Sequence, residues 1–387
     1  MKMRMTQLKT IADIQTGPFG SQLHKEDYVE TGTPIVTVEH LGNRVFTEQN
    51  LPRVSDSDKA RLIKYTLSTG DIVFSRVGSV DRCSYVDKSH DGWMFSGRCL
   101  RVRPTELVDS LYLYYYFCLE ETKQFVRNIA VGATMPSINT KLLGEVEIAL
   151  PDLNNQKRIA AVLSSLDDKI ENNQKLNDNL ADLLQTIYQE RFGNDILAVN
   201  QGVLSDICSY SRDKVAVSEL NVITYFSTEN MLSGKAGSTE ATSLPTTSQT
   251  TACHKGDTLI SNIRPYFKKI VYCEDKCGCS TDVLCFTPSQ PRYSAYLFST
   301  LYADKFFAFM VAGSKGTKMP RGDKQQIMTY PVLLPSEEEL AGFNTIASPL
   351  LEQIYSNRAE NKRLSILRDT LLPKLMSGEI NVSAVQL

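Results

Sequence analysis

Two long stretches of this sequence contain the same motifs in the same order. Gly70-Asp-Ile-Val-Phe-Ser75 returns as Gly256-Asp-Thr-Leu-Ile-Ser261, an offset of 186 residues, and Ala133-Thr-Met-Pro136 returns as Thr317-Lys-Met-Pro320, an offset of 184. Repetition at so long a period predicts two structural units with similar folds, because each copy must bury a similar core. The chain of 387 residues is long enough for two such units.

A long amphipathic helix is predicted after each copy. Beyond Pro151 the apolar residues recur at alternating steps of four and three, and the pattern returns 184 residues later. This spacing is typical of a coiled-coil seam. Leu176 and Leu183 widen the apolar stripe, which indicates that the first helix packs on more than one neighbour. The residues predicted to pair the helices are Ile159, Leu163, Leu166, Ile170, Leu180, Leu184, Ile187, Leu350, Ile354, Leu364 and Leu371.

Polar residues interrupt both predicted seams. Asn173 and Asn177 fill two steps of the first helix, and Asn357 and Asn361 fill the same steps of the second. Such residues cost stability but can fix register and partner choice. Alternatively, they face water where the helix drifts off the seam, and the sequence leaves both interpretations open. Arg368 also falls on an apolar step, which predicts less regular pairing of the second helix there.

Segments between the motifs are rich in β-branched residues and alternate in polarity, which predicts an α+β class. We expect two similar mixed α/β domains, each followed by a long helix, with the helices paired as an antiparallel coiled coil. The predicted boundaries are 1–150, 151–193, 194–335 and 336–387. A helix of about 36 residues would be about 54 Å long, so a helix pair could hold two domains a fixed distance apart.

The composition excludes several classes of protein. The longest near-apolar run, residues 111–119, has nine residues, whereas roughly 18 are needed to span a bilayer. The N-terminal residues lack the apolar segment of a signal peptide, so no membrane association and a cytoplasmic location are expected. The nine cysteines are an odd number spread along a chain without an export signal, which favours reduced thiols over a disulfide framework. The spacing of Cys273, Cys277 and Cys279 is unlike a zinc site, so no metal and no cofactor are expected.

The net charge of −2 neither supports nor excludes a nucleic acid as partner. Residues 1–150 contain 18 basic and 18 acidic side chains, and residues 200–335 contain 14 and 11. Any DNA-binding face must therefore be a local patch. Phosphate-binding, dinucleotide-binding and nucleophile-elbow motifs are absent, and the four histidines are scattered. The chain alone is therefore not expected to be an enzyme.

Two pairs of basic stretches are the candidate DNA-binding face, because bases and phosphates are contacted by Arg, Lys, Asn and Gln. Residues 313–324 form a glycine-rich stretch with four cations, equivalent to 132–141 in the first copy. Residues 262–269 interleave aromatic and basic side chains, and 75–82 are their counterpart. The alternative for each is a solvated basic surface. The candidates are Arg76, Arg82, Asn139, Lys141, Arg264, Lys268, Lys269, Lys315, Lys318, Arg321 and Lys324.

A further row of cations, Arg98, Arg101 and Arg103, alternates along one predicted strand. It is a weaker candidate, because rows of cations are common on the exposed faces of strands.

The order of these elements resembles a known family. A mixed domain is followed by Leu150-Pro-Asp-Leu-Asn-Asn-Gln-Lys-Arg-Ile-Ala160 and a heptad helix, and the whole arrangement is repeated once. The segments Ile14-Gln-Thr-Gly-Pro-Phe-Gly-Ser21 and Leu371-Leu-Pro-Lys-Leu-Met-Ser-Gly-Glu-Ile380 are also similar to that family. Together they resemble the specificity subunit of a type I restriction-modification system. The second copy departs at residues 335–340, where Gln-Lys-Arg is lost.

The resemblance implies two target recognition domains, each reading one half of a split double-stranded DNA sequence. The helices would set the gap between the halves and dock methyltransferase subunits, two of them expected, which restriction subunits would join. The subunit itself would perform no chemistry. The alternative is a non-enzymatic coiled-coil scaffold that binds proteins and no DNA. The weak net charge favours that scaffold slightly, and the repeated basic loops oppose it.

Overall fold

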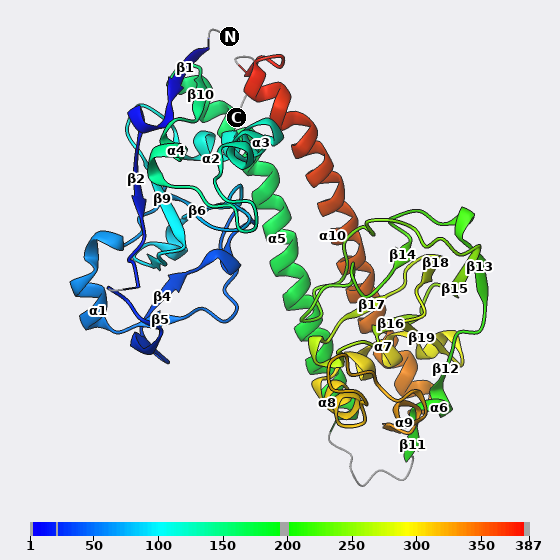
Figure 1. Cartoon of the computed structure of the whole chain (residues 1–387). Coiled ribbons are helices and arrows are strands. Elements are labelled where there is room, and N and C mark those ends of the chain that lie inside the picture. Colours follow the sequence, from blue (N-terminus) through cyan, green and yellow to red (C-terminus); the bar gives the residue numbers. More distant parts are fainter. Residues whose placement is uncertain (1–2, 21, 194–200, 383–387) are drawn as a thin grey trace. The chain divides into compact units, whose positions relative to one another are not determined.

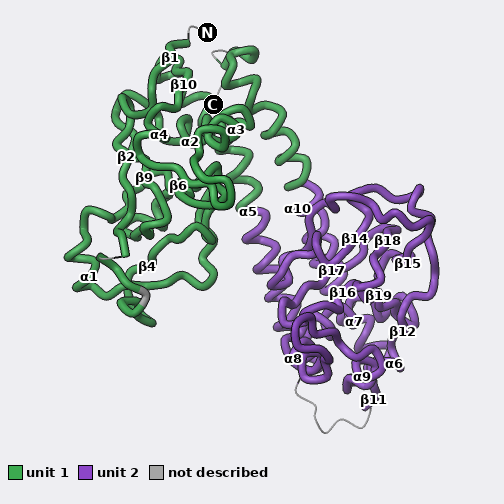
Figure 2. Tube along the Cα trace, viewed as in Figure 1, with its two compact units in different colours: residues 1–171, 361–387 green, residues 172–360 purple. Residues whose placement is uncertain are grey.

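The computed structural model describes residues 3–20, 22–193 and 201–382, and the chain divides into two compact units (Figures 1 and 2). The first unit comprises residues 1–171 and 361–387, and the second comprises residues 172–360. Each unit therefore holds one mixed domain and a half of each long helix. The predicted start of the second domain, residue 194, lies outside the described residues.

Two four-stranded sheets form the domain of the first unit. One has the order β2-β9-β6-β7 and is antiparallel throughout, and the other has the order β3-β5-β4-β8, in which β4 and β8 are parallel. The strands are β1 (Arg4–Gln7), β2 (Ala12–Thr16), β3 (Tyr28–Val29), β4 (Thr33–Val36), β5 (Arg53–Val54), β6 (Ile72–Ser75), β7 (Cys83–Tyr85), β8 (Met94–Phe95), β9 (Cys99–Pro104) and β10 (Glu147–Leu150). The helices are α1 (Asp56–Arg61), α2 (Ser110–Cys118), α3 (Glu120–Ile129), α4 (Thr140–Gly144) and α5 (Leu153–Phe192).

Strand β6 explains why the Gly-Asp motif is followed by an unbroken apolar run. Ile72 and Phe74 point to the core shared with α2 and α5, and Phe74 meets Phe117 of α2 with ring centroids 4.7 Å apart. Val73 points to the opposite core, under the second sheet. Because successive residues of a strand face opposite sides, a strand that is covered on both faces is apolar throughout.

The second unit repeats this architecture, although its second sheet has a different strand order, with β18 and not β14 next to β15. Its sheets have the orders β12-β19-β16-β17 and β13-β15-β18-β14, and β11 pairs with β20 as β1 pairs with β10. The strands are β11 (Gln201–Val203), β12 (Cys208–Tyr210), β13 (Lys214–Ala216), β14 (Tyr225–Phe226), β15 (Gln249–Cys253), β16 (Thr258–Ser261), β17 (Ile270–Tyr272), β18 (Cys277–Cys279), β19 (Val283–Pro288) and β20 (Pro331–Leu333). The helices are α6 (Leu204–Ile207), α7 (Ser294–Tyr302), α8 (Asp304–Ala312), α9 (Lys324–Met328) and α10 (Glu337–Ser377). The predicted duplication and α+β class are confirmed.

Short 3₁₀ helices connect several of these elements. Those of the first unit are Leu8–Thr10, Lys25–Asp27, Val38–His40, Ile63–Tyr65 and Lys88–His90, and those of the second are Val217–Glu219, η7 (Pro265–Phe267) and Pro291–Tyr293. No helix within residues 3–20, 22–193 and 201–382 is long and apolar enough to cross a membrane.

Within the first unit, α5 and α10 run antiparallel. The Asn361 amide donates to the Ile170 carbonyl oxygen at 3.1 Å, and Arg368 Nη1 donates to Asp167 Oδ1 at 2.7 Å. As the residue number falls along α5, that of its partner on α10 therefore rises. Ile159 and Leu163 join the same core as the last turns of α10.

Within the second unit the helices pair in the same sense. The Asn173 amide donates to Glu360 at 2.7 Å, and the Asn357 amide donates to Asn177 Oδ1 at 2.9 Å. Three of these asparagines are nearly inaccessible: Asn173, Asn177 and Asn357 are 3, 8 and 5 % exposed. The interpretation that they face water is wrong, and a paired amide seam joins the helices instead.

The predicted seam residues differ in burial. Ile159, Leu163, Ile170, Leu184 and Ile354 are buried. The partly buried ones are Leu166, Leu180, Ile187, Leu350, Leu364 and Leu371. Leu176 and Leu183 are 42 and 47 % exposed, so nothing in the described chain covers the wider stripe expected of the first helix.

Arg368 does not disturb the pairing, which corrects the expectation from sequence. Its guanidinium forms an ion pair with Asp167, whose side chain is only 7 % exposed. Asp167 also accepts a hydrogen bond from the Tyr115 hydroxyl at 2.7 Å. Hydrogen bonding to Asp167 raises the pKa of Arg368 against the opposing effect of burial. A cation on an apolar step is accommodated here because the facing helix supplies a buried acid.

Candidate nucleic-acid interface

The glycine-rich basic stretch of the second unit forms a tight hairpin loop between α8 and α9. Lys315 and Arg321 exchange backbone hydrogen bonds of 2.9 and 3.0 Å, which leaves residues 316–320 as the tip of loop 315–321. Gly316 has φ +103°, a conformation that side chains with a Cβ rarely adopt. The conformation of this turn therefore explains why residue 316 is a glycine.

This loop is fixed against the other basic stretch of the same unit. Arg264 N donates to Pro320 O at 2.8 Å, and Gly322 N donates to Asn262 O at 3.3 Å. Residues 262–269 follow strand β16, about fifty residues earlier in the chain. The fold therefore brings the two predicted DNA-binding stretches of the second unit side by side.

The first unit contains the same arrangement. Val131 and Ser137 exchange backbone hydrogen bonds of 2.9 and 2.8 Å around Gly132, which has φ +109°. This loop 131–137 is fixed to the residues after strand β6, since Gly78 N donates to Pro136 O at 2.8 Å. Each unit thus presents one tight loop beside the end of one strand.

The four cations of residues 313–324 differ in how far other residues of the chain already engage their side chains. Lys318 is exposed at the tip, and its side chain forms no hydrogen bond or ion pair with any residue that the structure describes. Lys315 Nζ lies 2.6 Å from an Asp323 oxygen and Arg321 Nη2 lies 3.0 Å from Asp282 Oδ1. Lys315 lowers the pKa of the Asp323 carboxyl. Lys324 lies over the Tyr210 ring, with Nζ 6.0 Å from its centroid.

The cations after strand β16 are more engaged within the protein. Lys268 Nζ is 3.0 Å from Asp304 Oδ1, and Lys269 Nζ donates to the Thr228 carbonyl oxygen at 2.6 Å. Burial lowers the pKa of Lys269. The half-buried Arg264 is different, because its buried Nε has no hydrogen-bond partner among the described residues. Of these three, Arg264 has the donor that most needs an acceptor.

In the first unit, Arg76 Nη1 donates to Gly97 O at 3.1 Å and the guanidinium lies 5.4 Å from the centroid of the Phe19 ring. Arg82 and Lys141 are exposed. The Asn139 side chain caps helix α4 by accepting from Leu142 N at 2.9 Å. The oxygen of Asn139 therefore stabilises the fold, and only its amide group is left for a ligand.

The weaker candidates Arg101 and Arg103 form internal ion pairs. Arg101 is 5 % exposed and lies 2.8 Å from Asp13, and Arg103 lies 2.7 Å from Asp71. Asp71 is the acid of the repeated Gly-Asp motif and accepts from Ser68 N at 2.8 Å, as Asp257 accepts from His254 N at 2.8 Å. The motif therefore recurs because it closes the same buried turn in both units.

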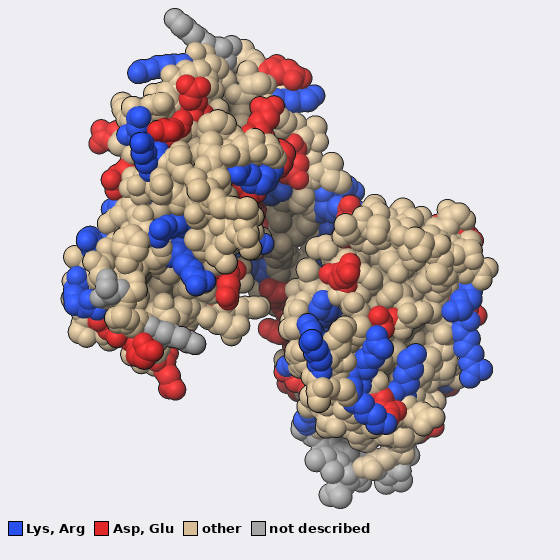
Figure 3. Space-filling model, in the orientation of Figure 1, with Lys and Arg blue, Asp and Glu red and all other residues tan. Residues whose placement is uncertain are grey.

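Exposed apolar side chains at these loops were missed by the sequence prediction. Met135 and Met319 at the loop tips are 64 and 52 % exposed, and Phe19, Tyr266 and Phe267 nearby in the chain or the fold are also exposed. The recurrence of Met-Pro in both copies was the available signal, but contacts to bases and phosphates were expected from polar and charged side chains. Figure 3 shows basic and acidic side chains scattered among other residues on the visible face of each unit.

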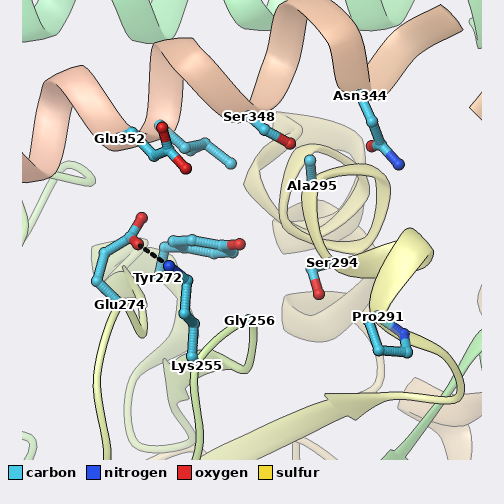
Figure 4. Close-up of a pocket in the computed structure, with 11 residues that line it drawn as sticks. Lys255, Gly256, Tyr272, Glu274, Pro291, Ser294, Ala295, Asn344, Ser348 and Glu352 are labelled. Carbon is cyan, nitrogen blue, oxygen red and sulfur yellow. Dashed lines mark ion pairs between the residues drawn. The ribbon is translucent and has the colours of Figure 1, made fainter. Parts of the chain in front are cut away.

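A cavity of about 340 Å³ lies elsewhere in the second unit, between α7, α10, the residues just before β16 and the end of β17 (Figure 4). Lys255 Nζ is 3.9 Å from an oxygen of the nearly buried Glu274, and Glu352 lies across the cavity. Burial raises the pKa of Glu274, and the charge of Glu352 adds to this effect. None of the predicted DNA-contact residues is among the described residues that line this cavity.

The clustered cysteines lie in the core of the second unit. Cys253, Cys273, Cys277, Cys279 and Cys285 are buried together, and Cys273 Sγ is 3.6 Å from Cys277 Sγ. All nine cysteines of the chain are free. Among the residues that the structure describes, no group of three or more His, Cys, Asp or Glu side chains is arranged to hold a metal ion. Here the thiols serve as small apolar side chains.

The chain is similar to several known proteins. Residues 2–181 match the family described as type I restriction modification DNA specificity domain. The type I restriction enzyme MjaIX specificity subunit of Methanocaldococcus jannaschii is 26% identical over 323 residues, which are 72% of this chain and 71% of that protein. The type I restriction enzyme HindI specificity subunit of Haemophilus influenzae is 26% identical over 158 residues, which are 40% of this chain and 34% of that protein.

A solved structure shares the fold. The S subunit of the type I restriction-modification system from M. genitalium superimposes with a TM-score of 0.62 at 18% sequence identity, over 97% of this chain and 96% of that one.

Proposed function

Because this chain belongs to the family of type I restriction-modification specificity subunits, we propose that it directs such a complex to a split DNA sequence. As a specificity subunit it is not the catalytic component. The observation that carries the proposal is the recurrence, in both units, of a tight loop fixed beside the end of one strand. Two similar surfaces in one chain suit a target with two halves.

We propose that residues 1–150 and 194–335 are the target recognition domains, and that 151–193 and 336–387 are the helical segments that set the gap. In each domain the loop and the strand end supply the DNA contacts. Exposed cations such as Lys318 suit phosphates, which are contacted without regard to sequence. The unpartnered Nε of Arg264 is a donor that suits a base edge or a phosphate.

The helices are proposed to dock methyltransferase subunits, through which restriction subunits join the complex. Leu183 and Leu367 occupy equivalent positions in the two copies, 184 residues apart, and are 47 and 46 % exposed. Exposed apolar side chains at related places are typical of protein interfaces. Two equivalent leucines favour two equivalent partners, and hence two methyltransferase subunits.

The proposal is tested by mapping DNA methylation in a host with and without the gene for this chain, together with its methyltransferase partner. We expect methylation at one split motif to disappear when the gene is deleted, because the specificity subunit selects the site. The motif would also give both half-sites. An unchanged methylation map in a host whose methyltransferase is active would contradict the proposal and favour the protein scaffold.

Removing the exposed cations of loop 315–321 is expected to weaken DNA binding. A phosphate contact contributes about 0.9 to the slope of log affinity against log salt concentration. We therefore expect Lys318→Ala to lower the affinity and to reduce that slope by about 0.9, and Arg321→Ala to lower the affinity as well. The measurement is a salt titration of the assembled complex with a fluorescent duplex that contains the split motif.

Lys276→Ala is the matched control for this experiment. Lys276 lies in the same unit, is 60 % exposed and is paired with Glu219, but it lies outside the basic stretches. Its removal changes the net charge equally. If Lys318→Ala and Arg321→Ala both leave affinity and salt slope at the values of the Lys276→Ala complex, the loop is not part of the DNA interface.

A further inference from the structure

Each unit exposes one methionine at the tip of its loop. Met135 and Met319 occupy the same place in the repeat and are 64 and 52 % exposed, and each precedes a proline. Single exposed apolar residues are common on protein surfaces and need no explanation. Here, however, the same apolar residue is exposed at the same place twice.

The backbone around each methionine is firmly held. Both loops are closed by a reciprocal pair of backbone hydrogen bonds and fixed to a neighbouring strand end by a third, of 2.8 Å in each unit. The proline fixes its own φ and restricts the residue before it to extended conformations. The methionine side chain therefore projects from a tip that has little freedom to fold it back onto the protein.

The surroundings of both methionines are basic and aromatic. In the second unit, Lys318 precedes Met319, and Arg264 contacts the following residue through its backbone. Tyr266 and Phe267, which follow Arg264, are 50 and 39 % exposed with ring centroids 4.7 Å apart. In the first unit, Arg76 stacks on the exposed Phe19 ring. An apolar side chain surrounded by cations is unsuited to packing against the apolar surface of another protein. It is suited to a polyanion that has apolar faces between its charged groups.

DNA is such a polyanion, because stacked bases are apolar between charged backbones. Methionine is among the side chains that enter between base pairs and kink the duplex, at a cost of a few kcal/mol per unstacked step. It is unbranched and polarisable, so it can slide between stacked rings. Cations beside the tip would hold the flanking phosphates while the step opens.

We propose that Met135 and Met319 are wedges, each entering between two base pairs of its own half-site. This inference rests on the proposed function and extends it to a mechanism of specificity. Pyrimidine–purine steps open most readily, so each wedge would favour a half-site that has such a step at one position. Part of the sequence preference would then arise from DNA deformability, without a hydrogen bond to a base edge.

The test uses the full-length chain in complex with its methyltransferase subunits and duplexes that carry the split motif. Adenines are replaced one at a time by 2-aminopurine, whose fluorescence rises when it is unstacked. The base that becomes methylated is excluded, because methyltransferases extrude their target base. We expect a rise at one step of each half-site, and we expect Met319→Ala to abolish the rise in one half-site only and to weaken binding about tenfold.

Two variants make the outcome specific. Met135→Ala should abolish the rise in the opposite half-site, and Met319→Leu, which keeps an apolar side chain of similar length, should retain it. Binding of the wild-type complex with no unstacked step, or an equal rise with Met319→Ala, would overturn the wedge while leaving the specificity role intact. Failure of the wild-type complex to bind the motif duplex at all would overturn the proposed function together with the wedge.

Discussion

Replacing Arg368 by alanine is expected to lower the free energy of unfolding by about 3 kcal/mol, because breaking a buried ion pair leaves an uncompensated charge. The charge left behind is that of Asp167, whose side chain is 7 % exposed. It would retain the Tyr115 hydroxyl at 2.7 Å but lose the guanidinium at 2.7 Å. Denaturant unfolding of the full-length chain, followed by circular dichroism, measures the difference.

Arg363→Ala is the matched control, because Arg363 is an exposed arginine on the same helix. Its loss should change stability by less than about 0.5 kcal/mol, as is usual for surface substitutions. The double variant Asp167→Leu, Arg368→Met should recover most of the lost stability, since it removes both charges at once. An Arg368→Ala chain as stable as the Arg363→Ala chain would show that the ion pair does not stabilise the fold.

Arg368 also shows where prediction from sequence ends. The four–three spacing identified the helix and placed Arg368 on its seam, because both follow from local periodicity. Its partner could not be identified in the same way. Asp167 is 201 positions away, and the two meet only because the helices pair antiparallel in one particular register. The same holds for Asn177 and Asn357, whose facing amides decided between the two interpretations left open by the sequence.

The candidate interface was predicted only in part, because tertiary contacts decide which of its residues are free to bind a ligand. Repetition of the motifs identified both loops, and the structure brings each one beside the second basic stretch of its unit. Residue type alone could not distinguish the exposed Lys318 from Lys269, which is tied to a carbonyl oxygen, or from Arg101, which is buried against Asp13. Those differences depend on tertiary contacts. Met135 and Met319 were not predicted, because contacts to bases and phosphates were expected from polar side chains only.

Inserting one heptad into each long helix is expected to lengthen the gap between the half-sites by about three base pairs. Seven residues add about 10.5 Å to a helix, and a DNA turn of 34–36 Å holds about 10 base pairs. The half-site sequences should not change, because the loops proposed to read them are untouched. Methylation mapping of a host that expresses the extended chain measures gap and half-sites together.

The insertion must be made in both helices at facing positions, since the seam is antiparallel. A heptad placed after Asn177 alone would move every later residue of α5 by two turns relative to α10, and the apolar contacts of Leu184 with the facing helix would be lost. We expect that single insertion to reduce stability and abolish methylation. The paired insertion has a second heptad before Asn357. It keeps the residues of α5 on either side of the insertion opposite their original partners on α10. A paired variant that methylates the original spacing, or a different half-site, would contradict the role of the helices as spacers.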